Sequence, residues 1–92
     1  MIVRIAGEGQ YRLPDGDQDR LNELDNEAVG AVEAGDEPKF KELWAQMLEI
    51  VKADGNELGD DELLESDVIL PPRDVTFEEA QGEFTGEGLI PD

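Results

Sequence analysis

The chain has 92 residues and is strongly acidic, with 25 Asp and Glu against 7 Lys and Arg and a formal net charge of -18. This charge repels phosphate backbones and anionic lipid head groups, so direct binding to nucleic acid or insertion into a membrane is not expected. There is no His and no Cys, which excludes Ser-His-Asp and Cys-His catalysis and zinc sites that use those ligands.

Size and hydropathy predict one small domain. A chain of this length buries about 60–65% of its unfolded surface, so its core is small. The 38% apolar content is enough for folding, and no run of about 18 apolar residues is present to span a membrane. The N-terminus lacks a signal-peptide pattern, and the absence of Cys fits the cytoplasm. We expect a cytoplasmic protein with a single domain over residues 1–84 and a flexible tail over residues 85–92.

The acid excess has two interpretations. It is the solvated surface of a protein in a salt-rich cytoplasm, where ions screen the self-repulsion, or it is a docking face for a basic protein. Lys is scarce and the acidic residues are scattered rather than gathered in blocks. This scatter favours salt adaptation and leaves the docking alternative open.

The first predicted element is a β-hairpin. Residues 2–6 form a short apolar run rich in β-branched side chains, and residues 10–13 alternate polar and apolar. Between them, Gly7-Glu8-Gly9 supplies the positive φ that a tight hairpin loop needs. The side chains expected on one face of the hairpin are Val3, Ile5, Tyr11 and Leu13.

A first helix is predicted over residues 17–34. Asp15, Asp17 and Asp19 suit its N-terminus as capping groups and as partners of the helix dipole. Gly35 is expected to stop the helix. The apolar stripe at helical spacing consists of Leu21, Leu24, Ala28 and Val32, with Ala31 at its margin.

A second helix is predicted from an N-cap at Asp36 to about Ala53, with Pro38 in its first turn. The short link between the two helices makes them an antiparallel αα-hairpin. The second helix has the broader apolar arc, so we expect it to face more of the core. This arc consists of Phe40, Leu43, Trp44, Met47, Leu48, Ile50 and Val51.

In the last third of the chain, the polar residues 56–61 predict a loop. The apolar run within residues 67–70 predicts a short strand that Pro71-Pro72 ends. Thr76 and Glu79 form a capping box, which predicts a short helix with Phe77, Ala80 and Phe84 facing inward. Together the elements predict an α+β fold. A small antiparallel β-sheet, made of the N-terminal hairpin and the short third strand, packs with the αα-hairpin and the short C-terminal helix.

Two segments resemble calcium loops and fail the ligand template. The acids of residues 15–19 alternate as in an EF-hand, but Arg20 and Asn26 occupy the sixth and twelfth positions, where Gly and Glu are needed. The segment that starts at Asp54 fits better, yet Leu58 occupies a ligand position.

Other chemistry is also poorly supported. Gly7-Glu8-Gly9 lacks the third Gly and the following helix of a dinucleotide loop. Paired carboxylates are common in the chain, but a core this small leaves little room for the cleft that a glycosidase needs. We expect no catalytic residue, no cofactor and no metal ligand.

The candidate partner-binding residues are Trp44, Leu48 and Ile50. Trp44 is the single Trp and is interpreted first as a core anchor, since large aromatic side chains usually carry core packing. If exposed, it would be a binding hot spot. Leu48 and Ile50 lie at the edges of the apolar arc, where a partly covered face would contact a partner.

Several motifs resemble those of PspAA domain proteins, the small PspA-associated proteins of archaea and actinobacteria. The resemblance covers roughly residues 1–79, and its most specific parts are the N-terminal stretch and the Leu-Pro-Pro segment. The similar stretches are MIVRIAGEGQYRL at residues 1–13, Leu21, Leu24 and Asp25, AVEAGD at 31–36, DDEL at 60–63, Ser66-Asp67, LPP at 70–72 and DVTFEE at 74–79.

This resemblance implies an association with PspA, the coiled-coil protein that protects the inner face of the cell membrane under stress. It implies a non-enzymatic, cytoplasmic accessory role in that response, and the acidity suits a member from a halophilic archaeon. The alternative from another class is an acidic DNA mimic that binds a basic regulatory protein, which the charge favours and the scattered acids do not. A small calcium-dependent or carboxylate-based module is a third hypothesis.

Overall fold

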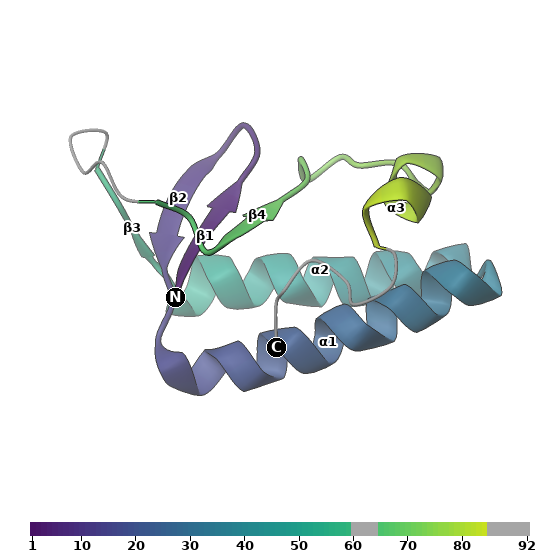
Figure 1. The fold of residues 1–92 in the computed structure, drawn as a ribbon, viewed down its shortest axis with the longest axis horizontal. Helices are drawn as coiled ribbons and strands as arrows, with labels where there is room; N and C mark the ends of the chain where they lie inside the picture. The colour runs from purple at the N-terminus through teal and green to yellow at the C-terminus, as the bar shows by residue number, and fades with distance from the viewer. Residues whose placement is uncertain (60–64, 85–92) are drawn as a thin grey trace.

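The computed structural model describes residues 1–59 and 65–84. A small sheet and a short helix lie along one side of two long antiparallel helices (Figure 1). In chain order the elements are β1 (Ile2–Ile5), β2 (Gly9–Arg12), α1 (Asp15–Ala34), α2 (Glu37–Asp54), β3 (Asn56–Glu57), β4 (Val68–Leu70) and α3 (Phe77–Glu83).

The sheet has four strands in the order β3-β2-β1-β4 and is mixed. The expected hairpin β1–β2 is antiparallel, and β3 pairs antiparallel with β2. The expected strand at the third position, β4, is present but runs parallel to β1, with Val3 beside Val68 and Ile5 beside Leu70. The α+β prediction is therefore confirmed, while the purely antiparallel sheet is wrong. The chain reaches β4 from β3 at the opposite edge of the sheet, and such a crossover leaves the strand direction free, whereas a tight hairpin would fix it as antiparallel.

Strand β3 lies where a polar loop was expected. It is only two residues long, and both of its side chains are exposed. Asn56 pairs with Arg12, and Glu57 pairs with Tyr11. Two exposed polar residues give no alternation of hydropathy, so this strand leaves no signal in the sequence.

The hairpin prediction is confirmed. Gly7 and Gly9 have φ values of 82° and 117°, which L side chains rarely adopt. Val3 pairs with Tyr11, so their side chains share a face of the sheet. All four side chains expected on that face are buried: Val3, Ile5, Tyr11 and Leu13.

The helix boundaries agree with the sequence, with one exception at the start of α1. The N-cap of α1 is Pro14 and it makes no side-chain capping hydrogen bond. Asp15 and Asp17 instead lie in the first turn, where their charge favours the helix dipole, so the expected capping role of the Asp residues is wrong. Gly35 ends α1 in the left-handed conformation at φ 72°, and the Asp36 carboxylate accepts the Lys39 N–H at 3.3 Å to cap α2.

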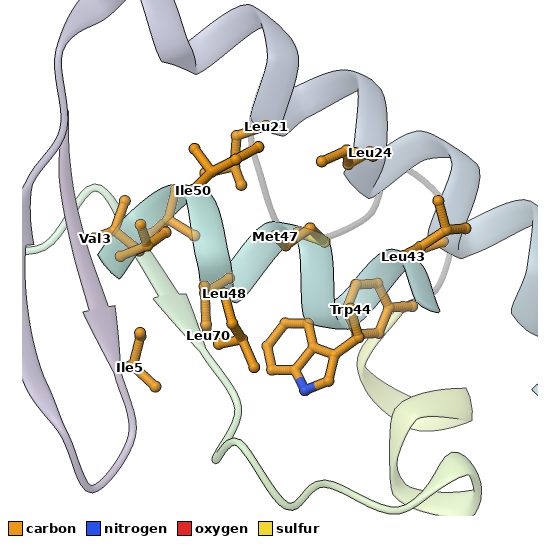
Figure 2. Packing of buried hydrophobic residues seen from close by; sticks show 14 of the residues in the cluster. Val3, Ile5, Leu21, Leu24, Leu43, Trp44, Met47, Leu48, Ile50 and Leu70 are labelled. Atoms are coloured by element: carbon orange, nitrogen blue, oxygen red, sulfur yellow. The ribbon is translucent and has the colours of Figure 1, made fainter. Parts of the chain in front are cut away.

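Helix α2 packs on two sides. Figure 2 shows Leu43, Met47 and Ile50 toward α1, whereas Leu48 lies beside Leu70 of β4 and Trp44 turns toward α3. All seven apolar residues predicted for its arc are buried, against six apolar residues on α1, and α2 packs on both α1 and β4, so it faces more of the core than α1 does. The stripe predicted for α1 is also buried, together with Val29 and the carboxylate of Asp25.

Helix α3 is joined to α2 by aromatic contacts. The capping box is confirmed, since the Glu79 N–H donates to Thr76 Oγ1 at 3.1 Å and the Thr76 N–H donates to Glu79 Oε1 at 3.3 Å. The Phe84 ring lies edge-on to Phe40 at 5.1 Å and to Trp44 at 5.8 Å between centroids. Such pairs are each worth about 0.5–1.5 kcal/mol beyond their buried area.

None of the helices in the described ranges combines the length and the hydropathy that a membrane crossing requires. The flexible tail expected over residues 85–92 lies outside the described residues.

The two glycines near the α1 terminus make a matched test of this geometry. Gly35 has a positive φ and Gly30 does not, and a Cβ at either position would meet no atom within 4 Å. We expect Gly35→Ala to lower the free energy of unfolding by about 1–2 kcal/mol, because the left-handed conformation is costly for an L side chain. Gly30→Ala should raise it by up to about 1 kcal/mol, because Ala is the better helix former. Urea unfolding of both variants measures this, and an equal loss in both would contradict the assigned helix end.

Candidate functional site

An open groove lies between α2 and residues 73–78, the last two of which are the first residues of α3, and its volume is about 730 Å³. We call it the α2 groove. Its volume is within the range of about 300–1,000 Å³ that is typical of ligand sites. The apolar side chains that line it are Phe40, Trp44, Ala45, Leu48, Val75 and Phe77.

Residues 73–78 form the wall of the α2 groove. A hydrogen bond from one buried donor holds this wall against α2. The Trp44 indole N–H donates to the carbonyl oxygen of Arg73 at 3.2 Å. Trp44 is 5% exposed, so the core and the wall together shield this donor from water, and the Arg73 carbonyl takes the place of water as its partner. Pro71 and Pro72 end β4 just before this contact, and the Val75 N–H closes a turn on the Pro72 carbonyl at 2.9 Å. The first residue of the wall, Arg73, is therefore held at a defined position beside α2.

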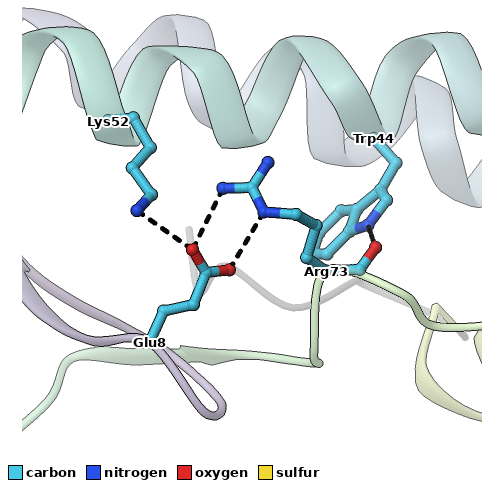
Figure 3. Close-up of polar contacts among 4 residues, drawn as sticks. All are labelled: Glu8, Trp44, Lys52 and Arg73. Carbon is cyan, nitrogen blue, oxygen red and sulfur yellow. Dashed lines mark hydrogen bonds and ion pairs between the residues drawn. The ribbon is translucent and has the colours of Figure 1, made fainter.

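A cluster of charges joins the same wall to the hairpin (Figure 3). The Glu8 carboxylate accepts two hydrogen bonds from the Arg73 guanidinium, at 3.2 Å from Nε and 3.1 Å from Nη2. Lys52 of α2 places its Nζ 3.0 Å from the same carboxylate. We call Glu8, Lys52 and Arg73 the Glu8 cluster. It connects the hairpin loop, α2 and the groove wall, which are distant in the sequence.

The pKa shifts in the Glu8 cluster follow from these contacts. Hydrogen bonds from Arg73 and then from Lys52 lower the pKa of the Glu8 carboxyl. A hydrogen bond to Tyr11, followed by the one to Glu8, raises the pKa of Lys52. The Lys52 ammonium also lies 5.3 Å from the centroid of the Tyr11 ring, which favours its charged form.

A second contact between charged groups raises the pKa of a carboxyl group instead of lowering it. Asp17 near the start of α1 faces Asp54 at the end of α2, and desolvation followed by repulsion from Asp54 raises the pKa of Asp17. The folded state therefore holds this proton more strongly than the unfolded state does. The contribution of Asp17 to stability decreases as the pH rises through the raised pKa.

The structure places the three candidate partner-binding residues on two sides of α2. Trp44 and Leu48 both line the α2 groove, and they are 5% and 3% exposed. Ile50 points toward α1 and lines a separate, smaller depression beside Arg20 and Asp54. Only the first two therefore share a surface.

Sequence reasoning missed the residues that complete the α2 groove. Ala45 and Val75 gave no signal, because a small residue on a helix and a lone Val in a loop are ordinary. The Glu8 cluster was also missed, although Glu8 between two hairpin glycines and Arg73 after two prolines were visible as charges at turns.

The calcium-loop candidates have different outcomes. Residues 15–19 lie within α1, so their helical backbone does not form such a loop. In the second candidate, Asp54 ends α2 and Asn56 belongs to β3, while residues 60–64 lie outside the described residues. In the part of the chain that the structure describes, no group of three or more acidic side chains is placed to hold a metal ion.

The Glu8 cluster predicts a specific pH dependence. Because the pKa of Glu8 is lowered from its ordinary 4.5, its stabilisation is present above that pH and is lost as the pH falls through the folded-state pKa. We expect Glu8→Gln to lower the free energy of unfolding by about 1 kcal/mol near pH 7, the scale of a partly exposed ion-pair network. The difference from wild type should shrink as the pH falls below 4.5 and through the lowered pKa of the folded state.

The control for this prediction is Glu23→Gln, which removes an exposed acid from α1. It should change the free energy of unfolding by less than about 0.5 kcal/mol. Thermal unfolding followed by Trp44 fluorescence measures both variants. A Glu8→Gln variant as stable as Glu23→Gln at neutral pH would show that the cluster contributes nothing.

Comparison with known proteins bears on the whole chain. No match was found among the curated proteins or among the solved structures that were compared. The family model described as PspA-associated protein, PspAA, matches residues 1–92. This match includes the stretches that carried the resemblance in the sequence, from the N-terminal hairpin to the capping box of α3. The chain therefore belongs to the PspA-associated protein (PspAA) family.

Proposed function

We propose that this protein is a non-enzymatic, cytoplasmic accessory protein that binds a PspA-like coiled-coil protein in the membrane stress response, and that the α2 groove is the contact surface. The observation that carries the proposal is an apolar groove on α2 in a chain of the PspA-associated family. A coiled-coil protein presents helices with regularly spaced apolar side chains, and grooves of this kind accept such helices.

The floor and wall of the α2 groove support binding of a protein rather than a reaction. Trp44 and Leu48 present only their edges to the groove, and Phe77 is half-buried on the opposite wall. Trp44 is therefore the core anchor that the sequence favoured, and Phe77 is the aromatic side chain that the groove leaves open to a partner, of a type enriched in protein interfaces.

Variants that test the groove must leave the core intact. Asp in place of Leu48 or Ile50 would place a charge in the core, because these side chains are 3% and 6% exposed. Ala45 is exposed and lines the groove, so Ala45→Trp fills the groove from a solvent-facing position. Ala53 is exposed on the same helix outside the groove, and Ala53→Trp is therefore the matched control.

We expect tagged wild-type protein to retain the PspA-like protein from a native lysate at the salt concentration of the cell, as identified by mass spectrometry. Ala53→Trp should retain it equally well. Ala45→Trp should lose most of it, because the added indole occupies the volume that the partner needs.

Two outcomes would contradict the proposal. Retention by Ala45→Trp at the wild-type level would remove the α2 groove from the contact. Recovery of a nucleoid or transcription protein that is lost at moderate salt, with the PspA-like protein absent, would favour the acidic DNA mimic instead.

A further inference from the structure

We propose that the occupant of the α2 groove is a basic amphipathic helix of the partner, with Lys or Arg flanking its apolar face. The inference rests on the proposed function for the identity of the partner, and it adds the chemistry of the segment that binds. Two features of the groove support this proposal. The first is its apolar floor, formed by Phe40, Trp44 and Leu48, and the second is the negative charge at its rim.

The floor of the α2 groove has the length of a short helical contact. Phe40, Trp44 and Leu48 are spaced four residues apart and therefore form one row along α2. With a rise of 1.5 Å per residue, this row spans about 12 Å. A second helix lying along the row would place about two turns against it, which is enough for two or three apolar anchors at i, i+4 and i+7.

The rim of the α2 groove carries uncompensated negative charge on one side. Its two cations already have partners, because Lys41 pairs with Glu37 at 3.1 Å and Arg73 pairs with Glu8 at 3.1 Å. In the wall, Asp74 and Glu78 have no ion pair among the described residues. All seven Lys and Arg of the chain lie in the described ranges, so the remaining residues supply no cation to neutralise them.

The net charge of the whole chain also favours a cationic partner. A net charge of -18 attracts a cationic segment over long range and repels an acidic one. Attraction alone would be unspecific, since acids are scattered over the whole surface. The apolar floor and the unpaired acids occur together at the α2 groove, and a helix that is both apolar and basic satisfies both at once.

The probe is a synthetic amphipathic helix of Leu and Lys, with two matched peptides that replace either its Lys by Glu or its Leu by Ser. Binding to the isotope-labelled protein is followed by NMR at low salt. Trp44 provides a single indole N–H signal, and this group donates to the groove wall. We expect the Leu–Lys peptide to shift the Trp44 indole and the amides of Val75 and Thr76, and the two matched peptides to leave them unchanged.

The acids of the wall are tested by the double variant Asp74→Asn/Glu78→Gln. Its affinity for the Leu–Lys peptide should fall roughly 2- to 30-fold, as expected for the loss of two exposed ion pairs. The control Glu23→Gln/Glu27→Gln removes two acids from the exposed face of α1 and should leave the affinity unchanged.

Three results would overturn the inference: shifts confined to α1, equal binding of the Leu–Glu peptide, or equal weakening by both double variants. The peptide experiment does not involve the PspA-like protein, so the two proposals fail separately. Groove shifts without retention of that protein would contradict the proposed function alone. Groove-dependent retention with an unaffected Asp74→Asn/Glu78→Gln variant would contradict the basic helix alone.

Discussion

The hydrogen bond from the Trp44 indole to the Arg73 carbonyl fixes how the chain lies against α2 after β4. Its acceptor belongs to the residue whose guanidinium pairs with Glu8, so one residue joins α2 through its backbone and the hairpin through its side chain. The aromatic contacts of Phe84 with Phe40 and Trp44 then hold α3 beside the same helix. Together these contacts fix the position of residues 73–78 beside α2, and the α2 groove lies between this segment and the helix.

Features that depend on neighbours in the sequence were predictable. The capping box of Thr76 and Glu79 spans three residues, and the turn at Gly35 and Asp36 is equally local. Apolar periodicity identified the buried face of α2, because a helix of 3.6 residues per turn repeats it along the sequence. These are the elements in which local propensity and tertiary packing favour the same conformation.

Features that depend on distant partners were not predictable. Glu8 and Arg73 are 65 residues apart, and Trp44 and Arg73 are 29 residues apart, so no spacing rule connects them. The direction of β4 follows from a crossover, and β3 is too short and too polar to show a pattern. The candidate site was accordingly predictable in part. Periodicity identified Trp44 and Leu48, but the wall that makes them a groove comes from tertiary packing.

The acidic residues are spread over the whole surface, so the net charge alone does not indicate where a partner binds. Three of the seven cations take part in ion pairs among described side chains, and the remaining excess of acids is left to solvent ions. This excess of negative charge attracts a cationic partner over long range. At the α2 groove, apolar side chains lie next to acids that have no ion pair among the described residues.

We propose that the PspA-like protein contacts this protein at the α2 groove. Hydrogen-exchange mass spectrometry of the purified protein, with and without the purified PspA-like protein at saturating concentration, tests it most directly. If the α2 groove is the contact surface, exchange slows in residues 73–78 and in the part of α2 that faces them, while the exposed face of α1 is unchanged. Protection confined to α1 or to the outer strands, or no protection at all, would contradict it.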